Sequence, residues 1–470
     1  MTEKPSGWRA ASALVGYPLM LGGAAGLFLL IRAAGVTLTA PAVEGERAPV
    51  GAPPGSTDVL LHVLLALVVV ILAARALGAL CKRLRQPPVI GEVIAGILLG
   101  PSLLGRLWPG ATSFLLPPAV APFLSILAQI GVILFMFLVG LDLDTGRLRH
   151  RTHATVAISH ASIIAPFLLG SVLALWLYPR LSTSDVPFTV FALFLGASLS
   201  VTAFPVLARI LTDQGLQKTR MGVIALTCAA VDDVTAWCLL AFVVSVVNAR
   251  VSGALTTFGL TGLYVLFMLL VARPLVARAV RAQELRKEVT QTATAVVVVG
   301  LLLSALATEA AGIHAIFGAF LLGAIVPHDS LLARDLTHKL EDLVVVLLLP
   351  AFFAFTGMRT QIGLVHGVSQ WLVCAVIIGV ASLGKFGGSY VAARITGLSA
   401  RDAASLGILM NTRGLMELIV LNLGLDLHIL SPTLFAMLVL MAIVTTLATT
   451  PVLQVLTAGV VEPEGEAARR

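Results

Sequence analysis

The stretch that decides the fold is Met221–Val247, MGVIALTCAAVDDVTAWCLLAFVVSVV. It is long and apolar enough to cross a bilayer as a helix, because about 20 apolar residues span the hydrocarbon core. Two adjacent carboxylates, Asp232 and Asp233, stand near its middle. An aspartate at the bilayer centre costs roughly 2.5 to 3.5 kcal/mol on insertion scales. The pair therefore indicates a partner inside the membrane: a cation, a proton or a basic side chain.

Successive residues of a helix point about 100° apart, so one carboxylate can face a water-filled cavity while its neighbour faces another helix. Lys385, in ASLGKFGGSY, is an isolated charge within another apolar segment and is the natural partner of one aspartate. A buried lysine titrates readily once its carboxylate is taken by a cation. The pair is thus either a transport element or a structural salt bridge. Two aspartates that are simply protonated or capped are the other alternative.

The remainder of the chain has the composition of a polytopic membrane protein. Of its 470 residues, 58% are hydrophobic and 12% are charged, and the mean hydropathy is +1.00. The formal net charge is +7, but the basic residues lie in short loops between apolar segments, which argues against nucleic-acid binding. The four cysteines are scattered, so neither a disulfide framework nor a zinc site is predicted. We expect no cofactor.

Apolar segments recur along the chain and predict about fourteen membrane crossings. They are residues 10–30, 58–80, 88–104, 121–141, 154–178, 188–211, 222–247, 255–272, 292–307, 313–326, 343–357, 370–393, 403–422 and 432–456. With a cytoplasmic N-terminus, basic residues fall at roughly 22 inside positions against roughly 6 outside ones. We therefore predict an all-α multi-pass protein of the bacterial inner membrane, surrounded by lipid, with both termini cytoplasmic.

Two short patterns occur twice in the same order. AGILLG at 95–100 resembles GAFLLG at 318–323, and FLVGLDLD at 137–144 resembles FAFTGMRT at 353–360. The equivalents are an odd number of helices apart, which gives two halves of opposite orientation, as in secondary transporters. Chance similarity between helices rich in small residues is the alternative. The predicted organisation is an N-terminal helix and extracytoplasmic loop (1–57), a first repeat (58–247), a linking helix and cytoplasmic loop (248–290), a second repeat (291–458) and a short cytoplasmic tail (459–470).

Two segments at equivalent repeat positions contain residues that interrupt a helix. GASLSVTAFPVLAR at 196–209 places Ser200, Thr202 and Pro205 within a span, where proline removes a backbone donor and frees carbonyls. GILMNTRGLMELIV at 407–420 places Arg413 and Glu417 within the equivalent span. Half-helices that end inside the membrane would offer carbonyls to a cation, and these two charges would neutralise their dipoles. A simple proline kink and a structural ion pair are the alternatives.

Six motifs together resemble the monovalent cation:proton antiporter-2 family, over residues 58–456. They are PPVIGEVIAGILLGPSLLG from Pro87, FLVGLDLD from Phe137, SVTAFPVLARILTDQGL from Ser200, AAVDDVTAW from Ala229, GKFGG from Gly384 and NTRGLMELI from Asn411. The resemblance implies about thirteen core helices in two inverted repeats, with crossed discontinuous helices beside the aspartate. The N-terminal helix is additional to these. The family fold also implies a dimer interface domain and a moving core domain.

The resemblance also implies roles for single residues. Asp233 corresponds to the family's cation- and proton-binding aspartate. Asp232 falls where electrogenic sodium exchangers have Asp and other branches have Asn or Gln, and Lys385 falls on the lysine that pairs with it. The broken-helix motif resembles the plant-type exchangers, whereas the Asp-Asp doublet resembles the sodium exchangers. This mixture leaves ion selectivity and stoichiometry open. The nucleotide-binding tail of the potassium-efflux members is not expected here.

The prediction is a secondary active Na⁺/H⁺ antiporter that works by elevator-like alternating access and is not an enzyme. Na⁺ and H⁺ compete for Asp233, with oxygens from Thr202 and the broken backbone completing the cation shell. If Asp232 is freed from Lys385, it adds a second proton and makes transport electrogenic. Potassium/proton exchange is the alternative, because carboxylate and carbonyl ligands do not fix the ion. A homodimer is expected.

Three other classes of protein make different predictions. An ion channel would show no proton coupling, and a solute symporter of similar architecture would not ordinarily need a buried set of two aspartates and a lysine. An intramembrane aspartyl protease needs its two aspartates on separate helices that face each other, which adjacent residues on one helix cannot provide.

Overall fold

The computed structural model describes residues 7–41, 59–142, 153–217, 219–248, 254–284, 289–311 and 314–457. All fourteen predicted apolar segments are helical in these ranges, which contain no strand. The all-α prediction is therefore confirmed. The predicted extracytoplasmic loop after residue 41 and the predicted tail at 459–470 lie outside the described residues.

Eleven helices in the described ranges are long and apolar enough to cross a membrane, and the bent pair Ala400–Met410 and Leu415–Asp426 makes a twelfth. Two shorter apolar helices, Leu19–Gly35 and Ala315–Ile325, account for the remaining predicted segments. The chain is thus a multi-pass membrane protein, in agreement with its hydropathy.

The chain divides into two compact units, and the first contains both discontinuous helices. Unit 1 takes in residues 1–43, 151–236 and 367–470. Its elements are α1 (Gly7–Gly35), α7 (His153–Leu181), α8 (Phe188–Ser200), α9 (Phe204–Asp213), the first part of α10 (Arg220–Asn248), α17 (Gly367–Ser382), the π-helical turn η5 (Leu383–Gly387), α18 (Gly388–Ile395), α19 (Ala400–Met410), α20 (Leu415–Asp426) and α21 (Pro432–Thr457).

Unit 2 takes in residues 44–150 and 237–366. Its elements are α2 (Val59–Arg83), α3 (Pro88–Leu99), α4 (Leu104–Leu107), α5 (Pro109–Leu115), η1 (Pro118–Val120), α6 (Ala121–Leu141), the end of α10, α11 (Ala254–Phe267), η2 (Met268–Ala272), α12 (Arg273–Glu284), α13 (Gln291–Ala310), α14 (Ala315–Ile325), α15 (Leu331–Leu343), η3 (Val344–Leu348), α16 (Leu349–Arg359) and η4 (Ile362–Leu364). Each unit combines segments from both predicted repeats, and the predicted repeat boundaries stay a prediction.

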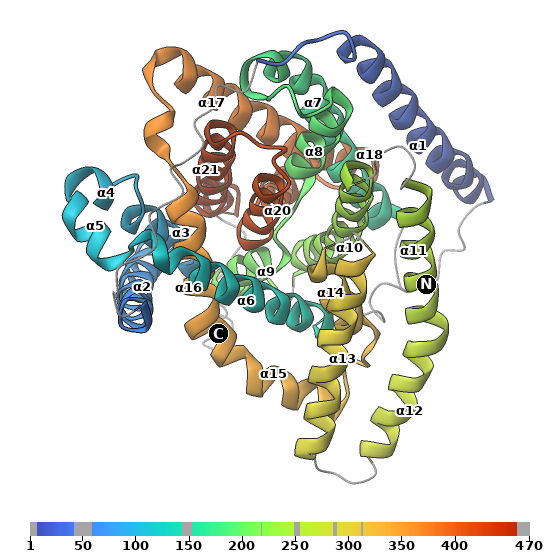
Figure 1. The fold of residues 1–470 in the computed structure, drawn as a ribbon. Coiled ribbons are helices and arrows are strands. Elements are labelled where there is room, and N and C mark those ends of the chain that lie inside the picture. Colours follow the sequence, from blue (N-terminus) through green and yellow to red (C-terminus); the bar gives the residue numbers. More distant parts are fainter. Residues whose placement is uncertain are drawn as a thin grey trace, which may run out of the picture. The chain divides into compact units, whose positions relative to one another are not determined.

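Within unit 2 the two repeats make the same helix contact twice. α3 lies beside α16, and α14 lies beside α6 (Figure 1). A Cβ atom added to Gly100, which closes AGILLG, would stand 2.9 Å from the carbonyl carbon of Gly357. A Cβ added to Gly323, which closes GAFLLG, would stand 2.9 Å from the Cα of Gly140. Each half thus presents a glycine to a glycine of the other half, as an inverted repeat requires.

Two charged stretches next to predicted apolar segments are helical, α12 and α15. A π-helical turn joins each of these helices to an apolar helix. The turn η2 joins α11 to α12, and the turn η3 joins α15 to α16. These stretches are charged yet carry leucine, valine or alanine at helical spacing. Such a pattern forms an amphipathic helix, and each of the two lies within one candidate span, Gly259–Glu284 or Leu331–Leu364.

Candidate functional site

The site lies in unit 1, where the two discontinuous helices touch. The backbone leaves the helical conformation between α8 and α9, at Val201 to Ala203, and between α19 and α20, at Asn411 to Gly414. The Ala203 N–H donates to the Thr412 carbonyl at 3.0 Å, which joins the two breaks. The predicted crossing of broken helices is therefore present. Pro205 sits in the first turn of α9 rather than at the break itself, where its missing N–H leaves no helical bond unmade.

Asp232 is saturated with hydrogen-bond donors. Its Oδ1 accepts from Ser159 Oγ at 2.7 Å, and its Oδ2 accepts from Ser162 Oγ at 2.5 Å and Thr202 Oγ1 at 3.0 Å. The Lys385 ammonium donates to the same Oδ2 at 3.1 Å. Both charged side chains are fully buried, with 0% exposure. The carboxylate is thus paired with Lys385 and buried inside the bundle.

Lys385 is satisfied in the same way. Besides Asp232, its Nζ donates to the carbonyl oxygens of Ser162 at 3.0 Å and Ser200 at 2.6 Å. An ammonium group has three N–H donors, and these three acceptors use all of them. Ser200 supplies its carbonyl to this contact, while its own hydroxyl donates to the Gly196 and Ile163 carbonyls.

The GKFGG motif explains how the lysine reaches this position. Lys385 lies in the π-helical turn η5, a geometry common at functional sites. A Cβ on Gly384 would stand 2.7 Å from Pro166 Cα, and one on Gly388 would stand 2.6 Å from the Ala161 carbonyl oxygen. The two glycines therefore allow η5 and α18 to pack directly on α7, the helix that carries Ser159 and Ser162.

Asp233 has a different environment from its neighbour. It is 4% exposed. The backbone N–H of Phe204, the first residue of α9, faces its carboxyl group. Its Oδ1 has no hydrogen-bond partner among the described residues. The N-terminal end of a helix carries partial positive charge and stabilises an anion, but one oxygen stays available to a ligand.

Arg413 connects the break between α19 and α20 to the C-terminal end of α8. Its Nη1 donates to the Ser198 carbonyl at 3.1 Å and to Glu417 Oε2 at 2.9 Å, and its Nη2 donates to the Leu199 carbonyl at 2.6 Å. These are carbonyls of the last turn of α8, which carry partial negative charge. Glu417 lies in the first turn of α20, the end that favours an anion, and accepts from Ser198 Oγ at 2.9 Å. Arg413 and Glu417 thus form an ion pair and also lie at the helix ends whose dipoles they oppose.

The structure brings together all the residues singled out from the sequence. One pairing differs from the prediction, that of Thr202. The Thr202 hydroxyl lies on Asp232, and no contact of its side chain with Asp233 is seen in the described part of the chain. Its proton points to Asp232 or the Met410 carbonyl, so its lone pairs stay free for a cation.

Ser159 and Ser162 were not anticipated from the sequence. They are three residues apart in α7, and residues at that spacing share one helix face. A pair of serines on one face of an apolar helix is the signal that could have identified them. Serines also occur in membrane helices that only pack together, so the pattern is not specific.

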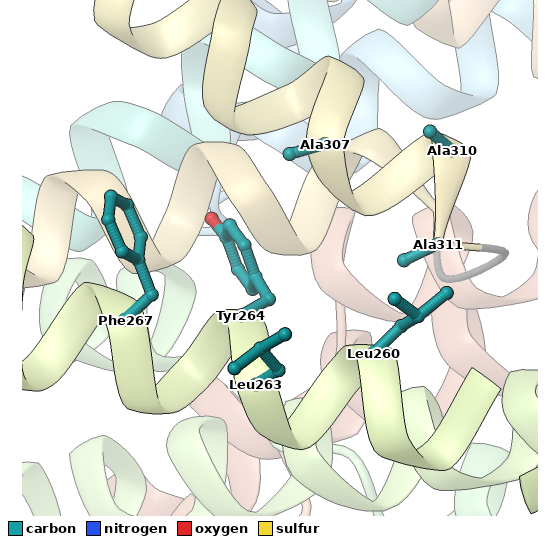
Figure 2. A pocket seen from close by; sticks show the side chains of 7 residues that line it. All are labelled: Leu260, Leu263, Tyr264, Phe267, Ala307, Ala310 and Ala311. Carbon is teal, nitrogen blue, oxygen red and sulfur yellow. The ribbon is translucent and has the colours of Figure 1, made fainter. Parts of the chain in front are cut away.

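Unit 2 contains an apolar groove of about 480 Å³ between α11 and α13. Figure 2 shows the side chains that line it, which are Leu260, Leu263, Tyr264, Phe267, Ala307, Ala310 and Ala311. The Tyr264 hydroxyl lies 2.6 Å from Ser304 Oγ. The lining has no carboxylate and therefore lacks the ligands that an alkali cation needs in a dry site.

A family profile described as "Sodium/hydrogen exchanger, transmembrane" matches residues 61–458. The Na⁺/H⁺ antiporter NhaS4 of Synechocystis sp. is 45% identical over 397 residues, which cover 84% of this chain and 97% of that protein. The Cation/H⁺ antiporter 20 of Arabidopsis thaliana is 40% identical, with 81% of this chain and 47% of that protein covered. For the K⁺/H⁺ antiporter 1 of Saccharomyces cerevisiae the identity is 34%, with 79% and 43% covered.

The chain therefore spans nearly all of the cyanobacterial relative but about half of these plant and yeast relatives. Among solved structures, the sodium proton antiporter MjNhaP1 of Methanocaldococcus jannaschii matches with a TM-score of 0.61 at 13% identity, covering 86% of this chain and 98% of that one. This likeness concerns the fold. By the profile and by the long match at 45% identity, the chain belongs to the sodium/hydrogen exchanger family.

Proposed function

We propose that this chain is a secondary active Na⁺/H⁺ antiporter in which Asp233 binds the two ions in turn. The observation that carries the proposal is the contrast within the doublet. Asp232 is filled by four donors, whereas Asp233 Oδ1 is buried and has no partner among the described residues. A buried anionic oxygen is costly unless a cation or a proton neutralises it.

The surroundings supply the other ligands that Na⁺ needs. Hard cations take oxygen ligands, and the Thr202 hydroxyl lies 3.0 Å from Oδ2 of Asp232, the residue that precedes Asp233. Val201 and Thr202 stand outside both half-helices, so their carbonyls are not committed to the helical hydrogen-bond ladder. A proton on Asp233 removes the negative charge that attracts the cation. Competition for this carboxylate couples the two fluxes.

Sodium is the first choice because a relative that this chain matches over 97% of its length is named a Na⁺/H⁺ antiporter. Potassium/proton exchange is the alternative, supported by the name of the yeast relative. The proposal includes alternating access by elevator-like movement, a homodimer in a bacterial inner membrane with both termini cytoplasmic, a role in pH homeostasis and no cofactor. It has no enzymatic step.

The test uses everted membrane vesicles from a strain that lacks its own Na⁺/H⁺ antiporters. A respiration-driven pH gradient quenches a fluorescent amine, and addition of Na⁺, K⁺ or Li⁺ reports exchange as dequenching. Asp233→Asn should abolish the response to every cation. The matched control is Asp213→Asn, because Asp213 is a half-exposed residue of α9 that pairs with Arg209. A fully active Asp233→Asn variant would refute the proposal, and single-channel currents without proton coupling would favour a channel.

A further inference from the structure

Each of the two discontinuous helices carries a threonine at the same place in its break. Thr202 is the second residue after the end of α8, and Thr412 is the second residue after the end of α19. The two spans hold equivalent positions in the predicted inverted repeat, so the two threonines are counterparts. The Thr202 hydroxyl lies on the Asp232 carboxylate. What the Thr412 hydroxyl does is not explained by the contacts described so far.

The backbone places Thr412 beside the unpaired carboxylate. The Ala203 N–H donates to the Thr412 carbonyl at 3.0 Å. The next N–H along the chain, that of Phe204, faces the Asp233 carboxyl group. Two consecutive N–H groups therefore meet Thr412 and Asp233, one each. The second break thus lies next to the carboxylate whose Oδ1 has no partner in the described part of the chain.

The Thr412 side chain is buried at this position, with 0% exposure. Its Oγ1 makes no hydrogen bond to any residue that the structure describes, and the same holds for Oδ1 of Asn411, which is 3% exposed. The amide nitrogen of Asn411 is used, because it lies 3.4 Å from Ser382 Oγ. Buried polar atoms without a partner are costly and uncommon, and a bound ion or water is a usual explanation.

The break removes the acceptor that a buried threonine normally uses. Thr445 and Thr449 of α21 donate to carbonyls one turn earlier in their own helix. Thr412 stands where the backbone is not helical. Thr450 also lacks a partner among the described residues, but it lies within α21 and not at a break. The position of Thr412, and not the missing hydrogen bond alone, therefore points to a ligand.

We propose that Thr412 is a further ligand of the transported cation, which is then held between the two breaks by one threonine from each repeat and by Asp233. The inference rests on the proposed antiport at Asp233. Hard cations take oxygen ligands, and the Thr412 hydroxyl offers lone pairs that no described residue uses. Small ions give up their hydration shell less readily, so the loss of one oxygen penalises Li⁺ and Na⁺ more than K⁺. Thr412 therefore also sets ion selectivity.

The test measures dequenching in everted vesicles at stepped concentrations of Na⁺, Li⁺ and K⁺. Thr412→Val replaces the hydroxyl by a methyl group of similar size. The half-saturating Na⁺ and Li⁺ concentrations should rise roughly fivefold or more, because one contact to a charged ligand is lost, while the maximal rate changes little. If the wild type exchanges K⁺, the rise for K⁺ should be smaller. Thr412→Ser should keep the wild-type values, and so should the matched control Thr450→Val, which removes an unpartnered hydroxyl outside the breaks.

The outcomes distinguish a wrong ligand from a wrong function. If the wild type shows no dequenching with any cation, the proposed antiport fails. If the wild type exchanges ions and folded Thr412→Val has unchanged half-saturating concentrations, Thr412 is not a ligand. Equal rises in Thr412→Ser or in Thr450→Val would also refute the inference, because the hydroxyl at the break would not be the cause. If Thr412→Val does not fold, Thr412→Ala carries the same expectation, because it removes the hydroxyl without adding a methyl group in its place.

Discussion

Replacement of Lys385 by methionine tests whether the buried ion pair holds unit 1 together. Methionine keeps an unbranched chain of similar length but leaves Asp232 without its cation. The Ser162 and Ser200 carbonyls lose a donor at the same time. Removal of one partner of a buried ion pair typically costs about 3–5 kcal/mol. Three hydroxyl donors remain on Asp232, so we expect a loss within that range rather than above it.

The second half of the test removes the stranded charge. Asp232→Asn in the Lys385→Met background leaves a neutral amide that the hydroxyls can still contact, and replacement of both members of a buried pair is often close to neutral. Most of the lost stability should therefore return. The interaction free energy from the double-mutant cycle should be about 2 kcal/mol or more. The double variant should also keep Na⁺/H⁺ exchange, because Asp233 is unchanged.

Both expectations can be measured by heating the detergent-solubilised protein and following the folded fraction by fluorescence-detected gel filtration. For a chain of this length, a loss of this size corresponds to a fall of about 3–5 °C in apparent melting temperature. The control is Lys339→Met, which removes an exposed i,i+4 pair with Asp335 and should change stability by less than about 0.5 kcal/mol. If Lys385→Met were as stable as the wild type, or if the double variant recovered no stability, the Asp232–Lys385 pair would not stabilise unit 1.

Two further substitutions are measured with the same heating assay. One tests helix packing in unit 2, and the other tests the polar contacts at the helix breaks of unit 1. Gly357→Ala would place a methyl group within the backbone of Gly96 on α3 and should cost about 3 kcal/mol or more, whereas Gly379→Ala meets no atom within 4 Å and should gain up to about 1 kcal/mol from helix propensity. Arg413→Lys keeps the charge but loses the planar fork that reaches two carbonyls and Glu417, so it should cost about 2–3 kcal/mol. The control Arg394→Lys, at an exposed residue, should change stability little. If Gly357→Ala lost no more stability than Gly379→Ala, or Arg413→Lys no more than Arg394→Lys, the contact under test would not stabilise the fold.

The sequence predicted the helices and the charged pairs because both follow from the cost of placing polar groups in lipid. An isolated Lys385 within an apolar segment has few possible anions, and Asp232 proved to be its partner. The details that depend on tertiary packing could not be predicted. The π-helical turn η5 forms where Gly384 and Gly388 meet α7, and no periodicity of the sequence contains that contact. Ser159 and Ser162 look like ordinary small helix residues until Asp232 faces them.

Because the two aspartates are adjacent, one can hold the surrounding helices while the other binds the ion. Asp232 ties α10 to α7 through two serines, to the break after α8 through Thr202, and to η5 through Lys385. Asp233 is the next residue on the same helix, so its position is fixed by contacts that it does not itself make. An exchange site needs this separation, because a carboxylate that must release Na⁺ and H⁺ in turn cannot also be the group that holds the surrounding helices together. The braced residue supplies rigidity, and the unpaired oxygen of its neighbour supplies the binding.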